Sequence, residues 1–175
     1  HEKTGFDFYS IHFFARNTGI IRSLALGDYT LNLGQGLICW QGLAVGTGAE
    51  ATNIKRQSAI LRPYNSAGGY FFNRGAAVTV GKRQWQATGF ISRKQLDANI
   101  EYNDERETET ATAIHTSGYH RTASETEDRG TLSMLMYGGN LSYSTATRHI
   151  GFSAIRYSFG KPIAKEKLPY NLYAL

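Results

Sequence analysis

The chain has 175 residues, of which 13% are aromatic, 19 are Gly and 3 are Pro, and its formal net charge is +5 at pH 7. This length suits one domain, and the composition favours a β-rich fold over a helical or disordered one. The longest apolar runs are only a few residues long, which excludes a membrane-crossing helix. Cys39 is the only cysteine, so the chain can form neither an intrachain disulfide nor a metal site with paired Cys ligands.

Alternation of apolar and polar residues predicts the first clear strand at residues 29–34. Tyr29, Leu31 and Leu33 occupy one face of this segment, and Thr30 and Asn32 occupy the other. Successive side chains of a strand point to opposite sides of the sheet, so the pattern predicts a strand with one apolar and one polar face.

Three later segments, at residues 85–92, 135–144 and 148–159, show the same period of two. In the first, Trp85 and Ile91 lie on the apolar face. In the last, the later apolar residues, Ile155, Tyr157 and Phe159, lie on the other face from the earlier ones, so the alternation is less regular there. The apolar faces of the three segments are Trp85, Ala87, Gly89 and Ile91, then Leu135, Tyr137, Gly139, Leu141 and Tyr143, and finally Ile150, Phe152 and Ala154.

Turns between the segments are either very short or long. Residues 81–84 and 144–147 have the spacing of β-hairpin turns. Two longer connections, at about 44–72 and 103–130, are rich in Gly or in polar and acidic residues. We therefore expect an all-β, antiparallel fold with two long loops.

The polar faces favour a membrane-spanning sheet over a soluble one. They carry Ser, Thr, Asn, Gln and Gly, whereas exposed faces of soluble sheets commonly carry Lys and Glu. Aromatic residues gather near the predicted strand ends, as an interfacial girdle requires. We expect residues 1–175 to form one transmembrane β-barrel domain, or a large fragment of one. The candidates for lumen-facing residues are Thr30, Asn32, Gln84, Gln86, Thr88, Asn140 and Ser142.

Six short motifs, each present once, follow one another along the chain. They are Gly27–Leu37, Asn53–Arg56, Leu61–Ser66, Phe72–Ala77, Thr116–Thr122 and Pro169–Tyr173. In order and spacing they resemble the barrel region of Bacteroidetes outer-membrane proteins that carry an N-terminal helix-hairpin-helix region. The resemblance spans most of the chain, implies a membrane barrel and implies no catalytic residue. Proteins of that family are longer, and this chain ends without a terminal aromatic residue, so we expect an internal part of a barrel.

A basic stretch with neighbouring aromatic residues lies in the first long connection. Its candidate residues are Lys55, Arg56 and Arg62, flanked by Tyr64 and Tyr70. Such a stretch can bind the phosphates of nucleic acid, of lipid headgroups or of lipopolysaccharide. A loop held by internal hydrogen bonds is the structural alternative.

Two histidines in the second long connection, His115 and His120, suit metal binding or acid-base chemistry, but their spacing fits no standard zinc motif. Ser117 or Ser124 with His120 and Asp128 supplies the residue types of a hydrolase triad, without the Gly-x-Ser-x-Gly turn. We therefore expect no catalytic, cofactor-binding or metal-binding residue. The candidates for anchoring this loop to the barrel are Tyr119, His120 and Arg121.

The leading functional hypothesis is a non-enzymatic outer-membrane barrel acting as a channel, a scaffold or a subunit of an envelope assembly. Its expected partners are outer-membrane lipid or lipopolysaccharide and other envelope proteins, and no cofactor is expected. The alternative is a soluble antiparallel β-barrel or sandwich that binds an anionic polymer such as nucleic acid. A third hypothesis is a membrane-embedded hydrolase that uses His120 with an acidic partner.

Overall fold

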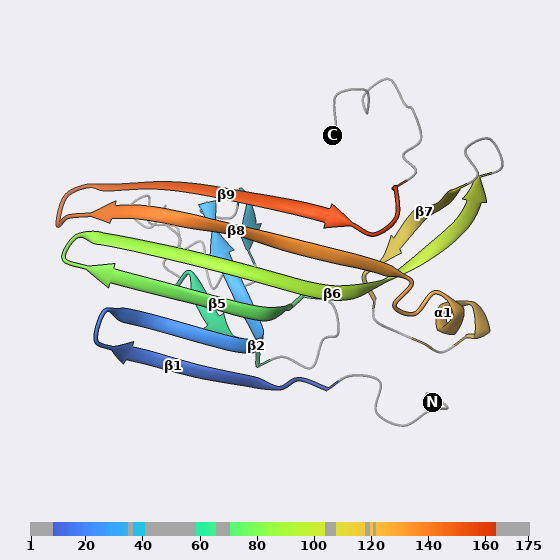
Figure 1. Cartoon of the computed structure of the whole chain (residues 1–175), viewed down its shortest axis with the longest axis horizontal. Coiled ribbons are helices and arrows are strands. Elements are labelled where there is room, and N and C mark those ends of the chain that lie inside the picture. The colour runs from blue at the N-terminus through green and yellow to red at the C-terminus, as the bar shows by residue number, and fades with distance from the viewer. Residues whose placement is uncertain are drawn as a thin grey trace, which may run out of the picture. The chain divides into compact units, whose positions relative to one another are not determined.

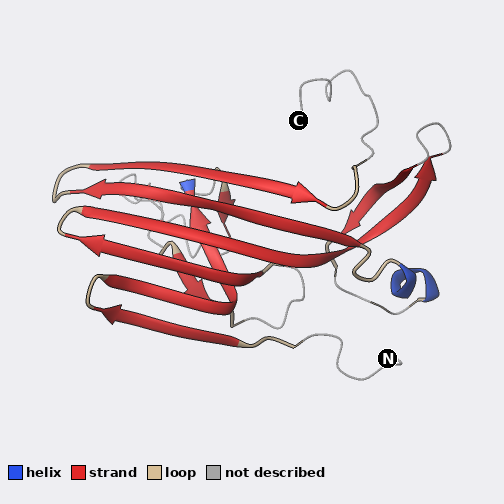
Figure 2. Cartoon of the chain, viewed as in Figure 1, coloured by secondary structure: helices blue, strands red, loops and turns tan. Residues whose placement is uncertain are grey.

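The structure is a computed structural model that describes residues 9–34, 37–40, 59–65, 71–103, 108–117, 120 and 122–163. These residues form nine strands and one short helix, so the fold is almost entirely β (Figure 2). In chain order the elements are β1 (His12–Thr18), β2 (Ile21–Leu33), β3 (Cys39–Trp40), β4 (Leu61–Pro63), β5 (Asn73–Lys82), β6 (Trp85–Asn103), β7 (Thr108–His115), α1 (Ala123–Glu127), β8 (Leu132–Ser144) and β9 (His149–Phe159).

Six of the strands lie in the order β1-β2-β5-β6-β8-β9, while β3 and β4 pair with β2, and β7 pairs with β6. The β1–β2, β5–β6 and β8–β9 turns lie at the same end of the sheet (Figure 1, left). The predicted antiparallel fold is confirmed, and so are the two predicted hairpins. Their turns are Arg83–Gln84 and residues 145–148, the second closed by a bond from the Thr145 N–H to the Arg148 carbonyl.

In the described residues the sheet does not close into a barrel. The path of paired strands ends at β1 on one side and at β9 on the other. The sequence predicts a membrane barrel or a large fragment of one, whereas the described residues form an open sheet with two edge strands.

The chain divides into two compact units. The first, which we call the sheet unit, comprises Phe8–Arg93 and Met136–Tyr157. The second unit comprises His1–Asp7, Lys94–Leu135 and Ser158–Leu175.

In the second unit, the C-terminal part of β6 pairs with β7, from Asp97 opposite His115 to Tyr102 opposite Glu109. The prediction of a long loop over residues 103–130 is therefore wrong for β7 and α1, which both lie within this range. Thr residues, which favour strands, alternate through β7, but its acidic neighbours obscure the pattern. Helix α1 begins at a capping box, in which the Thr122 hydroxyl accepts from the Glu125 N–H and the Glu125 carboxylate accepts from the Thr122 N–H.

Of the other predicted loop, 44–72, the structure describes residues 59–65 and 71–72, and β4 lies among them.

Candidate functional site

The sheet unit has an outer face that its own core does not cover. Phe13, Leu26, Ala76 and Ile91 are cross-strand partners on β1, β2, β5 and β6, so they form one row across the sheet. Phe13, Leu26 and Ile91 are 59%, 45% and 51% exposed. We call the surface that carries this row the outer face.

Apolar side chains continue along the outer face. On β6 this face carries the predicted alternation from Trp85 to Ile91, a length of about 20 Å at about 3.4 Å per residue. No charged residue lies between these two positions. We call these apolar positions the outer band, whose large exposed members are Phe13, Leu26, Trp85, Ile91, Tyr137, Leu141, Ile150 and Phe152.

An aromatic pair marks one end of the outer band. The Trp85 and Tyr143 rings lie 4.9 Å apart, centroid to centroid. Since residues two apart on a strand share a face, Tyr137 and Leu141 of β8 also point outward. On β9, the Ser153 hydroxyl accepts a hydrogen bond from the Asn140 side chain at 2.8 Å, on the opposite face from Tyr137 and Leu141. Because neighbouring side chains of a strand alternate, Phe152 points outward.

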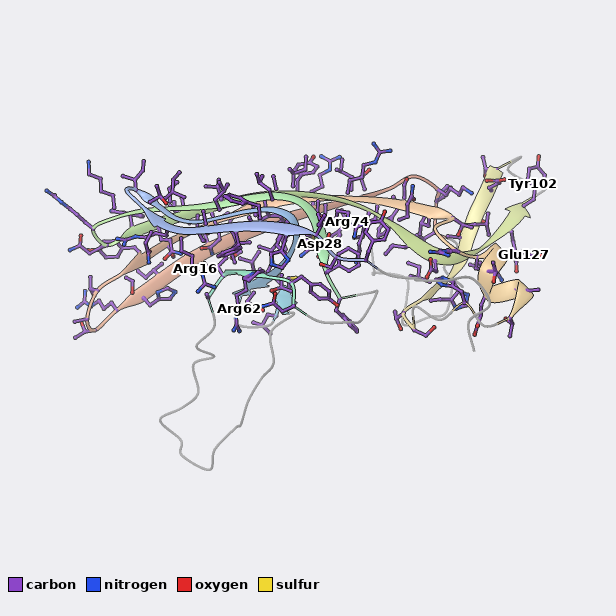
Figure 3. All side chains as sticks on the ribbon, turned by 90° about the horizontal axis from the view of Figure 1, so that it is seen from below. Arg16, Asp28, Arg62, Arg74, Tyr102 and Glu127 are labelled. Carbon is purple, nitrogen blue, oxygen red and sulfur yellow. The ribbon has the colours of Figure 1, made fainter. Side chains whose placement is uncertain are left out.

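An ion pair lies near the other end of β2 and β5. Arg74 donates to both carboxylate oxygens of Asp28, from Nε at 2.7 Å and from Nη2 at 3.0 Å (Figure 3). The Arg74 guanidinium also lies over the rings of Tyr9 and Phe72, and the Ile11 N–H donates to Asp28. Asp28, which is 1% exposed, is thus fully partnered. No local sequence pattern indicates this ion pair, because its two charged residues are 46 positions apart in the chain.

The inner face holds a packed apolar core. Phe14, Ala25, Ala77 and Phe90 are cross-strand partners in the row next to the outer one. Ala25, Ala77 and Phe90 are buried, and Phe14 packs against them. Ile155 packs against the same cluster, so the apolar positions of β9 change face after Ala154, as predicted. The inner side of β9 therefore changes from polar at Ser153 to apolar at Ile155.

The last part of β2 belongs to this core. Tyr29, Leu31 and Leu33 are buried with Leu61 of β4. The prediction that they form an outward apolar face is wrong, because β3 and β4 pair with this part of β2.

The two polar residues between them, Thr30 and Asn32, are buried as well. The Thr30 hydroxyl donates to the Arg62 carbonyl, and the Asn32 amide donates to the Ala59 carbonyl at 3.0 Å. Their hydrogen bonds hold β4 and its flanking residue against β2. These two lumen-facing candidates are therefore covered by β4 and its flanking residue in the described part of the chain.

Four of the other lumen-facing candidates lie on the inner face. Thr88 is buried and shares a 3.0 Å hydrogen bond with Thr79 of β5. Ser142 donates to the Gln86 carbonyl, and Asn140 bonds Ser153. Gln84 lies instead in the exposed β5–β6 turn. The inner face is therefore polar toward the hairpin end and apolar toward β4.

The basic candidates are only partly described. Arg62 is exposed on β4, below the sheet in the view of Figure 3. Lys55 and Arg56 lie outside the described residues.

The two described histidines of the second unit each contact a different aspartate. His120 Nε2 lies 3.1 Å from Asp97, and His115 Nε2 lies 3.3 Å from Asp128. The alternative of a hydrolase triad that joins His120 to Asp128 is therefore not assembled. His120 contacts β6 through Asp97, while the other anchoring candidates, Tyr119 and Arg121, lie outside the described residues. The described residues contain no group of three or more His, Cys, Asp or Glu that could hold a metal ion.

Comparisons of the chain with models of protein families, with curated proteins and with solved structures found no match. Within the described ranges, no helix is long and apolar enough to cross a membrane.

Proposed function

We propose that the sheet unit is a section of the wall of a bacterial outer-membrane β-barrel, with its outer band in contact with lipid. One observation carries this proposal: the face that points away from the core carries apolar residues on six strands, and those on β1, β2, β6, β8 and β9 include large exposed side chains. A soluble sheet that packs one face on its core normally turns polar residues outward. Contiguous exposed apolar surface marks contact with a membrane or another protein.

Three features favour lipid over a protein partner. Trp85 and Tyr143 form a tilted ring pair at one end of the outer band, where barrel walls carry aromatic residues. The band is about 20 Å long on β6, close to the about 25 Å of a barrel's apolar belt. The resemblance to the barrel region of Bacteroidetes outer-membrane proteins supports the same environment.

A wall in lipid must leave no unpaired strand edge, because unsatisfied backbone groups are costly in hydrocarbon. Membrane barrels have about eight strands or more. The path from β1 to β9 has six. We therefore propose that further antiparallel strands pair with β1 and β9 and complete the barrel.

The packed inner face favours a scaffold or a subunit of an envelope assembly over an open channel. Tyr29, Leu31 and Leu61 fill the space beside the inner face with apolar side chains. A channel wall would instead carry polar side chains in contact with water. The function that we propose is non-enzymatic, and the proposed partners are outer-membrane lipid and envelope proteins.

An arginine substitution in the outer band tests this environment. Leu141 is 49% exposed in the structure, so Leu141→Arg costs little if water covers this face. If lipid covers it, the variant loses about 2–4 kcal/mol of unfolding free energy, the cost of Arg near the bilayer midplane. Urea unfolding in lipid vesicles measures the loss. Ala146→Arg, in the exposed β8–β9 turn, is the control and changes stability by less than about 0.5 kcal/mol.

Equal stabilities of the two variants would contradict the proposal. The same preparation separates it from the soluble alternative, since a membrane wall needs detergent to stay in solution. A protein that remains soluble without detergent and shows no heat-dependent gel shift would favour the soluble sheet that binds an anionic polymer.

A further inference from the structure

Cations gather at the three turns that lie side by side at one end of the sheet (Figure 1). Arg22 follows the β1–β2 turn, Lys82 and Arg83 lie at the β5–β6 turn, and Arg148 lies in the β8–β9 turn. All four are exposed. We call these four residues the basic rim.

No carboxylate of the described sheet unit offsets this charge. Asp28 is the sole acidic residue there, and both of its carboxylate oxygens bind Arg74. Asp28 lies opposite Arg74, whereas the β5–β6 turn follows Lys82 at the far end of β5. The basic rim therefore carries four positive charges at the opposite end of the strands from the only described carboxylate of this unit.

The basic rim adjoins the aromatic end of the outer band. Lys82 is the direct cross-strand partner of Trp85, and the Trp85 ring contacts the Tyr143 ring in a tilted pair. In membrane proteins Trp and Tyr lie at the level of the headgroups. A cation one strand away from such a ring lies at the depth of the lipid phosphates.

We propose that the basic rim binds the phosphate groups of anionic lipid headgroups in the leaflet on its side of the membrane. This inference rests on the proposed function, and it assigns the phosphate contact to the three hairpins rather than to the Lys55–Arg62 stretch. Arg matches phosphate with paired N–H donors, and Lys binds it as a point charge. Each cation near an anionic surface contributes about a fivefold gain in membrane affinity.

The test compares insertion of the full chain into two kinds of vesicle, phosphatidylcholine alone and phosphatidylcholine mixed with phosphatidic acid, by flotation. We expect the wild type to favour the anionic vesicles. The double variant Lys82→Gln/Arg83→Gln loses about 25-fold of this preference, about fivefold per cation. Arg22→Gln/Arg148→Gln, on the other hairpins, is an independent second variant and loses a similar factor. Added salt weakens the preference.

The matched control is Arg62→Gln/Arg129→Gln, which removes two exposed cations outside the basic rim and leaves the preference unchanged. Insertion without any preference for anionic vesicles, or an equal loss in the control, overturns the rim assignment and leaves the membrane proposal standing. Failure to enter either kind of vesicle contradicts the membrane proposal itself. Binding of duplex DNA through Lys82 and Arg83, with no vesicle preference, also overturns the rim assignment and makes nucleic acid the partner.

Discussion

The carboxylate of Asp28 shows how one buried charge can hold three segments together. It binds Arg74 of β5 and the backbone N–H of Ile11, and Arg74 in turn donates to the Tyr9 carbonyl at 3.0 Å. Removing either partner of a buried ion pair costs more than the pair contributes, because the remaining charge stays desolvated. Arg74 is partly exposed, which moderates this cost. We therefore interpret the pair mainly as a device that fixes the start of β1 beside β2 and β5.

Gly75 gives Tyr29 access to a carbonyl on the next strand. Gly75 lies opposite Ser92 at a φ of 154°, and a Cβ atom there would collide with the Ile91 carbonyl oxygen. The Tyr29 hydroxyl, from β2, donates to that same oxygen at 2.8 Å. A residue without a side chain at this point therefore permits a hydrogen bond that crosses β5.

We expect Gly75→Ala to lower the unfolding free energy by about 2–4 kcal/mol, through backbone strain, the collision and the weakened Tyr29 bond. Gly89→Ala on β6 is the matched control, because nothing lies within 4 Å of a Cβ atom there. Its effect should stay within about 0.5 kcal/mol. Urea unfolding of both variants in the same vesicles measures the difference, and equal losses would show that Gly75 is not a special position.

At the scale of elements, β2 has two roles. Up to Gly27 it is a strand of the open sheet, paired with β1 and β5. From Tyr29 onward it also pairs with β4 and then with β3, and its side chains are buried on both faces. Because this second part has partners of its own, we interpret it with β3 and β4 as a fixed plug against the inner face.

Labelling of Cys39, the single cysteine, tests how firmly this plug is packed. Cys39 lies opposite Leu33, and its thiol donates to the Leu31 carbonyl at 3.7 Å. We expect a maleimide to modify it about 100-fold more slowly than a cysteine in an exposed turn, since reaction requires a local opening of about 3 kcal/mol. Ala146→Cys in a Cys39→Ser background provides the exposed reference. Equal rates would contradict a fixed plug and would favour a mobile element.

The strands that could be predicted are those whose two faces meet different surroundings. On β6 and β8 one face packs on the core and the other does not, so composition alternates as predicted. On the second part of β2 both faces are buried, so the same alternation predicted the strand and misassigned its apolar side. On β7 the exposed acidic residues hide a strand that buries little side-chain surface, chiefly at Thr110 and Ala111.

The candidate site was less accessible to sequence reasoning. The outer band follows from local alternation, and the residues on β6 were predicted individually. The basic rim and the Asp28–Arg74 pair depend on strand order, because their members lie on strands far apart in the sequence. Isolated cations in turns carry no local pattern, so only the topology brings them together.

At the scale of the whole molecule, charge separates the two units. The described sheet unit has one acidic residue, whereas the described part of the second unit contains Asp97, Glu101, Glu109, Glu125, Glu127 and Asp128. Carboxylates are costly in hydrocarbon and are placed in water wherever the fold allows. We therefore interpret the sheet unit as the part in lipid and the second unit as a part in water.

Quenching of tryptophan fluorescence by brominated lipid tests this separation. Trp40→Phe leaves Trp85 of the outer band as the sole tryptophan, and its emission should fall by about half or more when the acyl chains carry bromine, because an outward Trp at the aromatic end contacts lipid. For the second unit, Tyr102→Trp in a Trp40→Phe/Trp85→Phe background places a tryptophan at an exposed position beside Glu101. That emission should change little, because acyl chains do not reach a side chain in water. Equal quenching of the two would contradict the assignment of the units, and quenching of neither would contradict membrane insertion.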